Sequence, residues 1–135
     1  MRFAQDQASN VNVVRGYASG ELRINDSVFH TSMLVAADAL EAEPALADVA
    51  GLGSDHVARV MALKPEVVLV GTGSRQEFLA PGFAAPFLLA GIGVEVMSTG
   101  AACRTFNVLV SERRRVAALL IIGPKDTSGD PAVCH

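Results

Sequence analysis

Two short loops of small residues carry the groups that bind anions in proteins. Residues 71–73 are Gly-Thr-Gly, with Arg75 just beyond them, and residues 98–100 are Ser-Thr-Gly, with Arg104 in the segment that follows. Free N–H groups at a helix N-terminus and guanidinium groups both hold carboxylates or phosphates. We therefore predict a crevice for an anionic ligand. Its residues are Gly71, Thr72, Gly73, Arg75, Thr99, Gly100, Arg104 and Asn107.

The same loops also have a purely structural interpretation. In that interpretation the glycines turn the chain tightly after each strand, and the hydroxyl groups cap the helices. Neither loop matches a nucleotide-binding motif. Gln76 stands where a dinucleotide fingerprint needs its third glycine, and no phosphate loop ending in Gly-Lys-Ser/Thr occurs. The sequence therefore predicts no cofactor.

Cys103 is a weak candidate for a catalytic nucleophile. A position near a helix N-terminus and beside Arg104 would favour the reactive thiolate. However, Cys103 shares a largely apolar helix face with Phe106 and Val110, and free cysteines are among the most buried residues in proteins. Packing in the core is therefore the favoured interpretation, and the sequence assigns no catalytic residue.

The histidines do not form a metal-binding pattern. His30 and His56 are isolated, and His135 has only Cys134 beside it, whereas a structural zinc site needs about four ligands. The sequence therefore predicts no metal. The run of three arginines at 113–115 is interpreted as a solvated helix end or, alternatively, as a patch that docks a partner.

Alternating helices and strands must position the two loops. Ser54 is expected to cap a helix that ends at Pro65, and further helices are expected at 84–90, with Pro86 in the first turn, and at 101–112. Strands are expected at 67–70, 93–97 and 115–122. Helical crossovers imply parallel strands, whose carboxyl ends form the usual ligand crevice. The two loops should therefore meet at one edge of a sheet.

The first third of the chain has the pattern of an antiparallel meander. Strands are expected at about 11–17, 21–25 and 28–35, separated by turn signals such as Asn25-Asp26. Residues 36–53 are acidic and rich in alanine, and a loop, a ragged helix and an edge strand all remain open for them.

Composition restricts the class of protein. The chain has 135 residues, enough for one domain at 1–123 followed by a Gly- and Pro-rich tail at 124–135. A net charge of −3 argues against nucleic acid and anionic membranes, and two cysteines fit a reducing compartment. No apolar run reaches the roughly 18–20 residues that cross a bilayer, and the N-terminus has no secretory signal, so a cytoplasmic protein is expected. High apolar content also allows a homo-oligomer.

Residues 91–109, GIGVEVMSTGAACRTFNVL, form the most distinctive segment. Together with residues 68–73 and with Ile24-Asn25, this segment resembles the Mth-938-like family, which is related to mitochondrial complex I assembly factor 3. The resemblance implies a three-layer α/β domain with a central mixed sheet and an added antiparallel portion. It departs at Ser98, where aspartate is frequent in the family, and at Phe106, where tyrosine is frequent, which weakens an enzymatic interpretation.

The resemblance also implies a function. The mitochondrial relatives are non-enzymatic assembly factors that act through protein partners near the inner membrane. We therefore expect a protein-binding or assembly module whose partner is a subunit of a membrane complex. The alternative is a protein, or an enzyme, that binds a small anion at the two glycine loops.

Overall fold

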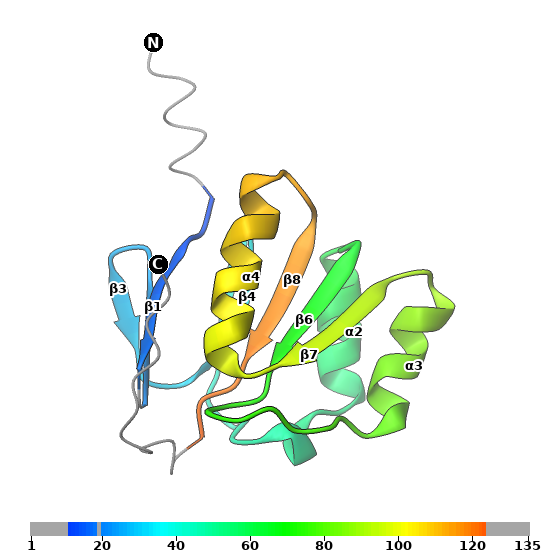
Figure 1. The fold of residues 1–135 in the computed structure, drawn as a ribbon. Coiled ribbons are helices and arrows are strands. Elements are labelled where there is room, and N and C mark those ends of the chain that lie inside the picture. The colour runs from blue at the N-terminus through cyan, green and yellow to red at the C-terminus, as the bar shows by residue number, and fades with distance from the viewer. Residues whose placement is uncertain (1–10, 19, 124–135) are drawn as a thin grey trace.

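A mixed five-stranded sheet forms the centre of the domain (Figure 1). The computed structural model describes residues 11–18 and 20–123. The strand order is β5-β4-β8-β6-β7, in which β8, β6 and β7 are parallel and β4 is antiparallel to both of its neighbours. The strands are β4 (Ser32–Ala36), β5 (Ala39–Glu43), β6 (Val67–Gly71), β7 (Gly93–Met97) and β8 (Val116–Leu120). This mixed sheet confirms the predicted α/β class.

Layers cover both faces of this sheet. Helices α2 (Ser54–Ala62) and α3 (Pro81–Leu89) lie on one face, and α4 (Thr99–Ser111) lies on the other (Figure 1). Beside α4 packs a small antiparallel sheet of β1 (Val14–Ala18), β2 (Glu21–Ile24) and β3 (Ser27–Phe29). In β6, Val67 and Leu69 belong to the core on the α4 side, whereas Val68 and Val70 belong to the core on the α2 and α3 side. Burial on both faces explains why this strand is a continuous apolar run.

The predicted single strand at 28–35 is wrong, because the chain changes sheets in the middle of it. β3 pairs with β2, and β4 pairs with β5 and β8. The buried Ser32 hydroxyl anchors the start of β4, since it donates to the Leu46 carbonyl at 2.6 Å and accepts from the Ile122 N–H at 2.8 Å. All five residues of β4 are buried, so its apolar residues do not alternate, and a pattern of period two could not locate the break.

Residues 36–53, left open by the sequence, contain the edge strand β5 and a 3-10 turn, η1 (Val49–Gly51). The Arg59 guanidinium of α2 binds the Glu43 carboxylate of β5 through both of its terminal nitrogens, with Nη2 at 2.7 Å from Oε1. Glu43 is 7% exposed, and Arg59 also reaches the more exposed Glu41 and Asp55. The hydrogen bond to Glu43 is the main reason why the pKa of Arg59 is raised. This ion pair attaches α2 to the edge of the sheet.

The helix starts differ from the predicted ones. The predicted cap Ser54 lies inside α2, and the residue at the cap position is Gly53, whose N–H donates to His56 Nδ1 at 3.1 Å. Helix α3 begins at Pro81, so Pro86 lies within the helix and not in its first turn. A proline there removes the N–H that would bond to the Gly82 carbonyl. Gly82 is exposed, so this turn of the helix lies at the surface.

Candidate functional site

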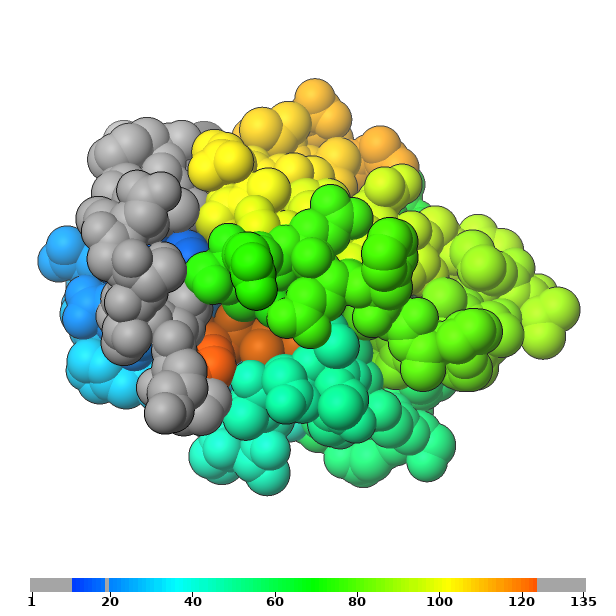
Figure 2. Space-filling view, turned by 60° about the horizontal axis from the view of Figure 1, so that its bottom comes forward, coloured from blue at the N-terminus to red at the C-terminus, as the bar shows by residue number. Residues whose placement is uncertain are grey.

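The two glycine loops meet where the parallel strands end, as predicted. β6 and β7 are adjacent parallel strands, with Gly71 opposite Met97, so both loops leave the sheet at the same end. Two hydrogen bonds join them directly: the Gly73 N–H donates to Thr99 Oγ1 at 2.8 Å, and the Thr99 N–H donates to the Gly73 carbonyl at 2.8 Å. Figure 2 shows this end of the molecule, where the green segment after β6 lies next to the yellow start of α4.

The Thr99 side chain occupies the space between the loops. Its hydroxyl is fully buried, accepts from Gly73 and donates to the Ile121 carbonyl at 2.7 Å, so it joins the ends of three parallel strands. Gly71 is in such close contact that a Cβ atom there would lie 2.8 Å from Thr99 Cα. At the contact of Gly71 with Thr99 the chain therefore packs without room for a ligand.

Thr72 also makes internal hydrogen bonds. Its hydroxyl donates to the Arg75 carbonyl at 2.6 Å and accepts from the Glu77 N–H at 3.1 Å, which fixes the turn after β6. Ser98 caps α4, since its hydroxyl accepts from the Ala101 N–H at 3.4 Å. The guanidinium groups of Arg75 and Arg104 are exposed and form no ion pair with any residue described here.

Asn107 and Cys103 lie deeper along α4. The Asn107 amide forms two hydrogen bonds with the backbone of Val14, accepting from its N–H at 2.9 Å and donating to its carbonyl at 2.7 Å. It thereby attaches the first strand of the small sheet to α4. Cys103 has no exposed surface and lies in the same core as Phe106. The structure therefore brings together the two loops that hold most of the eight predicted ligand residues. Asn107, in contrast, bonds to the backbone of Val14.

Anion binding is a direct test of the predicted crevice. Because the Gly73 N–H and both threonine hydroxyls already have partners, we expect phosphate and citrate to raise the melting temperature no more than sodium chloride of equal ionic strength does. Thermal unfolding of the wild type and of an Arg75→Ala/Arg104→Ala variant measures this. An increase that is seen in the wild type and lost in the double variant would instead establish an anion site.

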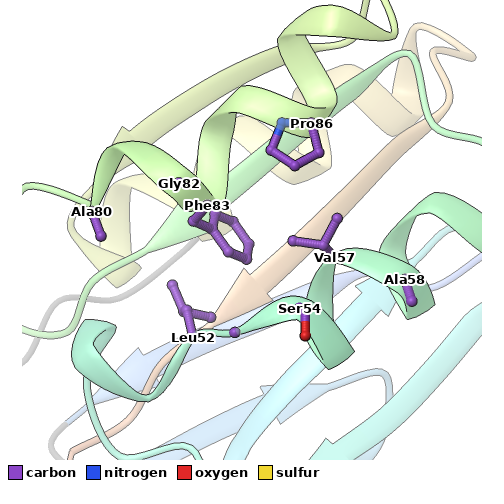
Figure 3. Close-up of a pocket in the computed structure, with 9 residues that line it drawn as sticks. Leu52, Ser54, Val57, Ala58, Ala80, Gly82, Phe83 and Pro86 are labelled. Atoms are coloured by element: carbon purple, nitrogen blue, oxygen red, sulfur yellow. The ribbon is translucent and has the colours of Figure 1, made fainter.

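A groove that the sequence did not indicate lies between α2 and α3 (Figure 3). It has a volume of about 420 Å³. The side chains of Leu52, Val57, Phe83 and Pro86 point toward one another across it. No charged side chain is among the residues that line it: Leu52, Gly53, Ser54, Val57, Ala58, Ala80, Gly82, Phe83 and Pro86.

Apolar side chains are also exposed along α3 and the loop before it. Phe78 is 93% exposed, Leu88 59% and Leu89 90%, and we call these three residues the α3 surface. Three of the five large apolar residues exposed within the described ranges therefore lie between positions 78 and 89. The signal that could have revealed this surface is the absence of any charged residue from 78 through 94. A helix that is apolar on its buried and its exposed sides gives no amphipathic period.

Two of the remaining candidates, Arg114 and His56, make contacts within the fold. Arg114 Nε binds Glu66 Oε2 at 2.6 Å, and this hydrogen bond is the main reason why the pKa of Glu66 is lowered. The arginine run therefore attaches the end of α4 to the start of β6. His56 Nε2 lies 3.7 Å from Glu43 Oε1. Within residues 11–18 and 20–123, no three His, Cys, Asp or Glu side chains lie close enough together to hold a metal ion. His135 and Cys134 lie outside the described residues, as does the predicted tail.

The fold and this site define a class of protein. It is a small three-layer α/β domain whose strand-end loops close on each other and whose exposed apolar side chains gather along one helix. The chain belongs to the family described as "Protein of unknown function (DUF498/DUF598)", which matches residues 14–121.

Two relatives and one solved structure show what this chain is similar to. The "13 kDa major membrane protein" of Francisella tularensis is 30% identical over 106 residues, which cover 78% of this chain and 86% of that protein. NADH dehydrogenase (ubiquinone) 1 alpha subcomplex assembly factor 3 of Xenopus tropicalis is 50% identical over 64 residues. The match covers 45% of this chain but only 35% of the assembly factor.

The solved structure of a Bordetella pertussis protein, described as an Mth938-like domain, superimposes on this one with a TM-score of 0.73, and the two sequences are 29% identical. The match covers 86% of this chain and 89% of that one. The resemblance to the Mth-938-like family is confirmed. Of the helices in the described part of the chain, none has the length and hydropathy that a bilayer crossing requires.

Proposed function

We propose that the chain is a non-enzymatic protein-binding module that assists the assembly of a larger complex in the cytoplasm. Its partner is a subunit of a membrane complex, and this subunit carries an apolar contact patch. The observation that carries the proposal is the α3 surface, with Phe78 and Leu89 almost fully exposed. Leu88 and Leu89 are adjacent residues at the end of α3, and groups of exposed apolar side chains mark contact sites for proteins.

Two further observations support this proposal. Helix α3 also forms one wall of the α2–α3 groove, so the partner has a concave apolar site on the same helix that carries Leu88 and Leu89. The hydroxyl and N–H groups that an enzyme would direct at a substrate are instead bonded to each other in the two loops. The likeness to a complex I assembly factor adds the class of partner.

A charged α3 surface should abolish partner binding. We expect Leu88→Asp/Leu89→Asp to recover at least ten-fold less partner than the wild type does. Burying two carboxylates in an apolar interface costs several kcal/mol, and each loss of about 1.4 kcal/mol weakens the affinity ten-fold. Affinity purification from cells that express the chain, quantified by mass spectrometry, measures the loss.

Val108→Asp is the matched control, because Val108 is an exposed apolar residue on α4 and not on α3. It should bind like the wild type. All three sites are exposed, so the variants should unfold within about 0.5 kcal/mol of the wild type. Equal recovery by the two variants, or recovery of no protein reproducibly, contradicts the proposed function.

A further inference from the structure

One outer edge of the central sheet is formed by β7, which among the described residues pairs with β6 alone. The Gly93 N–H donates to the Glu66 carbonyl at 3.2 Å, and the Met97 carbonyl accepts from the Thr72 N–H at 2.9 Å. Residues 93 and 97 therefore direct their backbone groups at β6. Because backbone groups alternate along a strand, Val94 and Val96 direct theirs away from the sheet.

Most of these outward backbone groups bond to no residue within 11–18 and 20–123. Gln76 Nε2 donates to the Val96 carbonyl at 3.3 Å. The Val94 N–H, the Val94 carbonyl and the Val96 N–H form no hydrogen bond with any described residue. Their spacing is that of a ladder on which one more strand can pair. The Gln76 amide thus already makes one of the hydrogen bonds that the N–H of an added strand would make.

Side chains on the two faces of β7 differ in character. Val94 packs in the core with Phe87 of α3, so the even-numbered side chains face α3. Phe83 and Phe87 point into the core, and Pro86 lines the groove toward α2. At 100° per residue, Leu88 therefore projects from the flank opposite α2. Helix α2 is attached to β5 at the other edge of the sheet and α3 contacts β7, so this flank of α3 faces the side of the sheet where β7 ends it.

The opposite face of β7 carries a charge. Glu95 is exposed there and forms no ion pair with any residue in the described part of the chain. In a pair of neighbouring strands, an opposite charge across from a glutamate is stabilising, and a like charge is destabilising.

We propose that β7 binds an extended segment of the partner as a sixth strand of the sheet. The segment carries apolar residues on the side that meets Leu88 and a lysine or arginine between them, opposite Glu95. Hydrogen bonds to Val94 and Val96 provide affinity, and the alternating side chains provide specificity, as in other cases of strand addition. This inference rests on the proposed function and names the chemistry of its partner. Two copies of this chain paired about Glu95 would place two carboxylates opposite each other, so a second copy is disfavoured.

Selection of peptides tests this inference without knowledge of the natural partner. A phage-displayed library of random heptapeptides is selected on the immobilised full chain, and the enriched peptide is synthesised and its Kd is measured by fluorescence anisotropy. We expect apolar residues at alternate positions with lysine or arginine between them. Hydrogen exchange of the Val94 and Val96 amides should be fast in the free protein and at least ten-fold slower with the peptide bound.

Two variants separate strand addition from mere contact with α3. Val94→Pro removes an N–H that bonds to no described residue, and edge strands tolerate proline at such positions, so the variant should fold. Because the hydrogen bond from this N–H to the peptide is lost, the peptide should bind at least ten-fold more weakly. Val94→Ile keeps the N–H and is the matched control. Glu95→Lys should reverse the selection toward aspartate or glutamate, and this variant covers the case in which Val94→Pro does not fold.

The outcomes are distinguishable from those of the proposed function. If Val94→Pro and Glu95→Lys bind the peptide like the wild type while Leu88→Asp/Leu89→Asp does not, strand addition is overturned and docking on α3 stands. Peptides without alternation overturn it as well. A dimer of the wild type in light scattering that Val94→Pro dissolves would assign the edge to a second copy of the chain and would also overturn it.

Discussion

Replacing Gly71 by alanine should destabilise the domain by roughly 3 kcal/mol, the upper end of the usual cost of overpacking a core. The added Cβ would lie 2.8 Å from Thr99 Cα, 3.0 Å from Thr99 Oγ1 and 3.1 Å from Ala102 Cβ. The nearest of these atoms belongs to the backbone of α4, so relief requires the helix to move away from β6. For a domain of this size, such a loss lowers the melting temperature by about 10 °C.

The consequence should be local as well as global. Displacement of α4 would lengthen the two hydrogen bonds between Gly73 and Thr99, so hydrogen exchange at the Gly73 amide should accelerate more than exchange in the small sheet. Denaturant unfolding and hydrogen exchange measure the two effects.

Gly82→Ala is the control for the Gly71 variant. No atom lies within 4 Å of a Cβ atom built at Gly82, which lies in α3. This substitution should be neutral or stabilise the domain by about 0.4–1 kcal/mol, because alanine restricts the unfolded chain. If Gly71→Ala unfolds at the same denaturant concentration as Gly82→Ala, the close contact between the loops is not a feature of the folded protein.

Replacing Arg59 by leucine should cost about 3–5 kcal/mol, the usual penalty for leaving a buried charge without its partner. Glu43 is 7% exposed and receives both arms of the guanidinium, so water cannot replace what Arg59 supplies. The lost ion pair connects α2 to β5, and α2 forms one wall of the α2–α3 groove. Denaturant unfolding at pH 7 measures the loss.

Two further variants test the cause of this loss. Arg59→Leu/Glu43→Gln removes the charge that would be stranded and should recover at least half of the lost stability. Asp55→Ala removes a partner of Arg59 that is 78% exposed and should cost less than about 1 kcal/mol. Additive losses in the Arg59 and Glu43 double variant would show that the ion pair does not hold α2 to the sheet.

Local signals along the chain were sufficient for most of the second half of the fold. The strands at 67–71 and 93–97 follow from short apolar runs that end in Gly-Thr-Gly and Ser-Thr-Gly, because such residues terminate strands and begin helices. Gly91 has a φ of +79°, the conformation expected at the C-terminal end of α3. The parallel arrangement of β6 and β7, and with it the meeting of the two loops, follows from the helix between them.

Other features depend on contacts between residues far apart in the sequence, which no local pattern reports. The passage from β3 to β4 is set by the Ser32 hydroxyl, whose partners are Leu46 and Ile122. The edge strand β5 is held by β4 and by the Arg59 fork.

The sequence by itself determined the alternation of helices and strands, and it placed both glycine loops at one end of the sheet, because these properties follow from the period of apolar residues and from turn chemistry. Only the tertiary structure decided whether that end is open. The Thr99 hydroxyl could equally have faced a ligand, but the close approach of α4 to Gly71 directs it to Gly73 and Ile121. Likewise, only the packing of α3 shows which of its apolar residues, Phe83 and Phe87 or Leu88 and Leu89, remain at the surface. Burial is a property of what surrounds a residue and not of the residue itself.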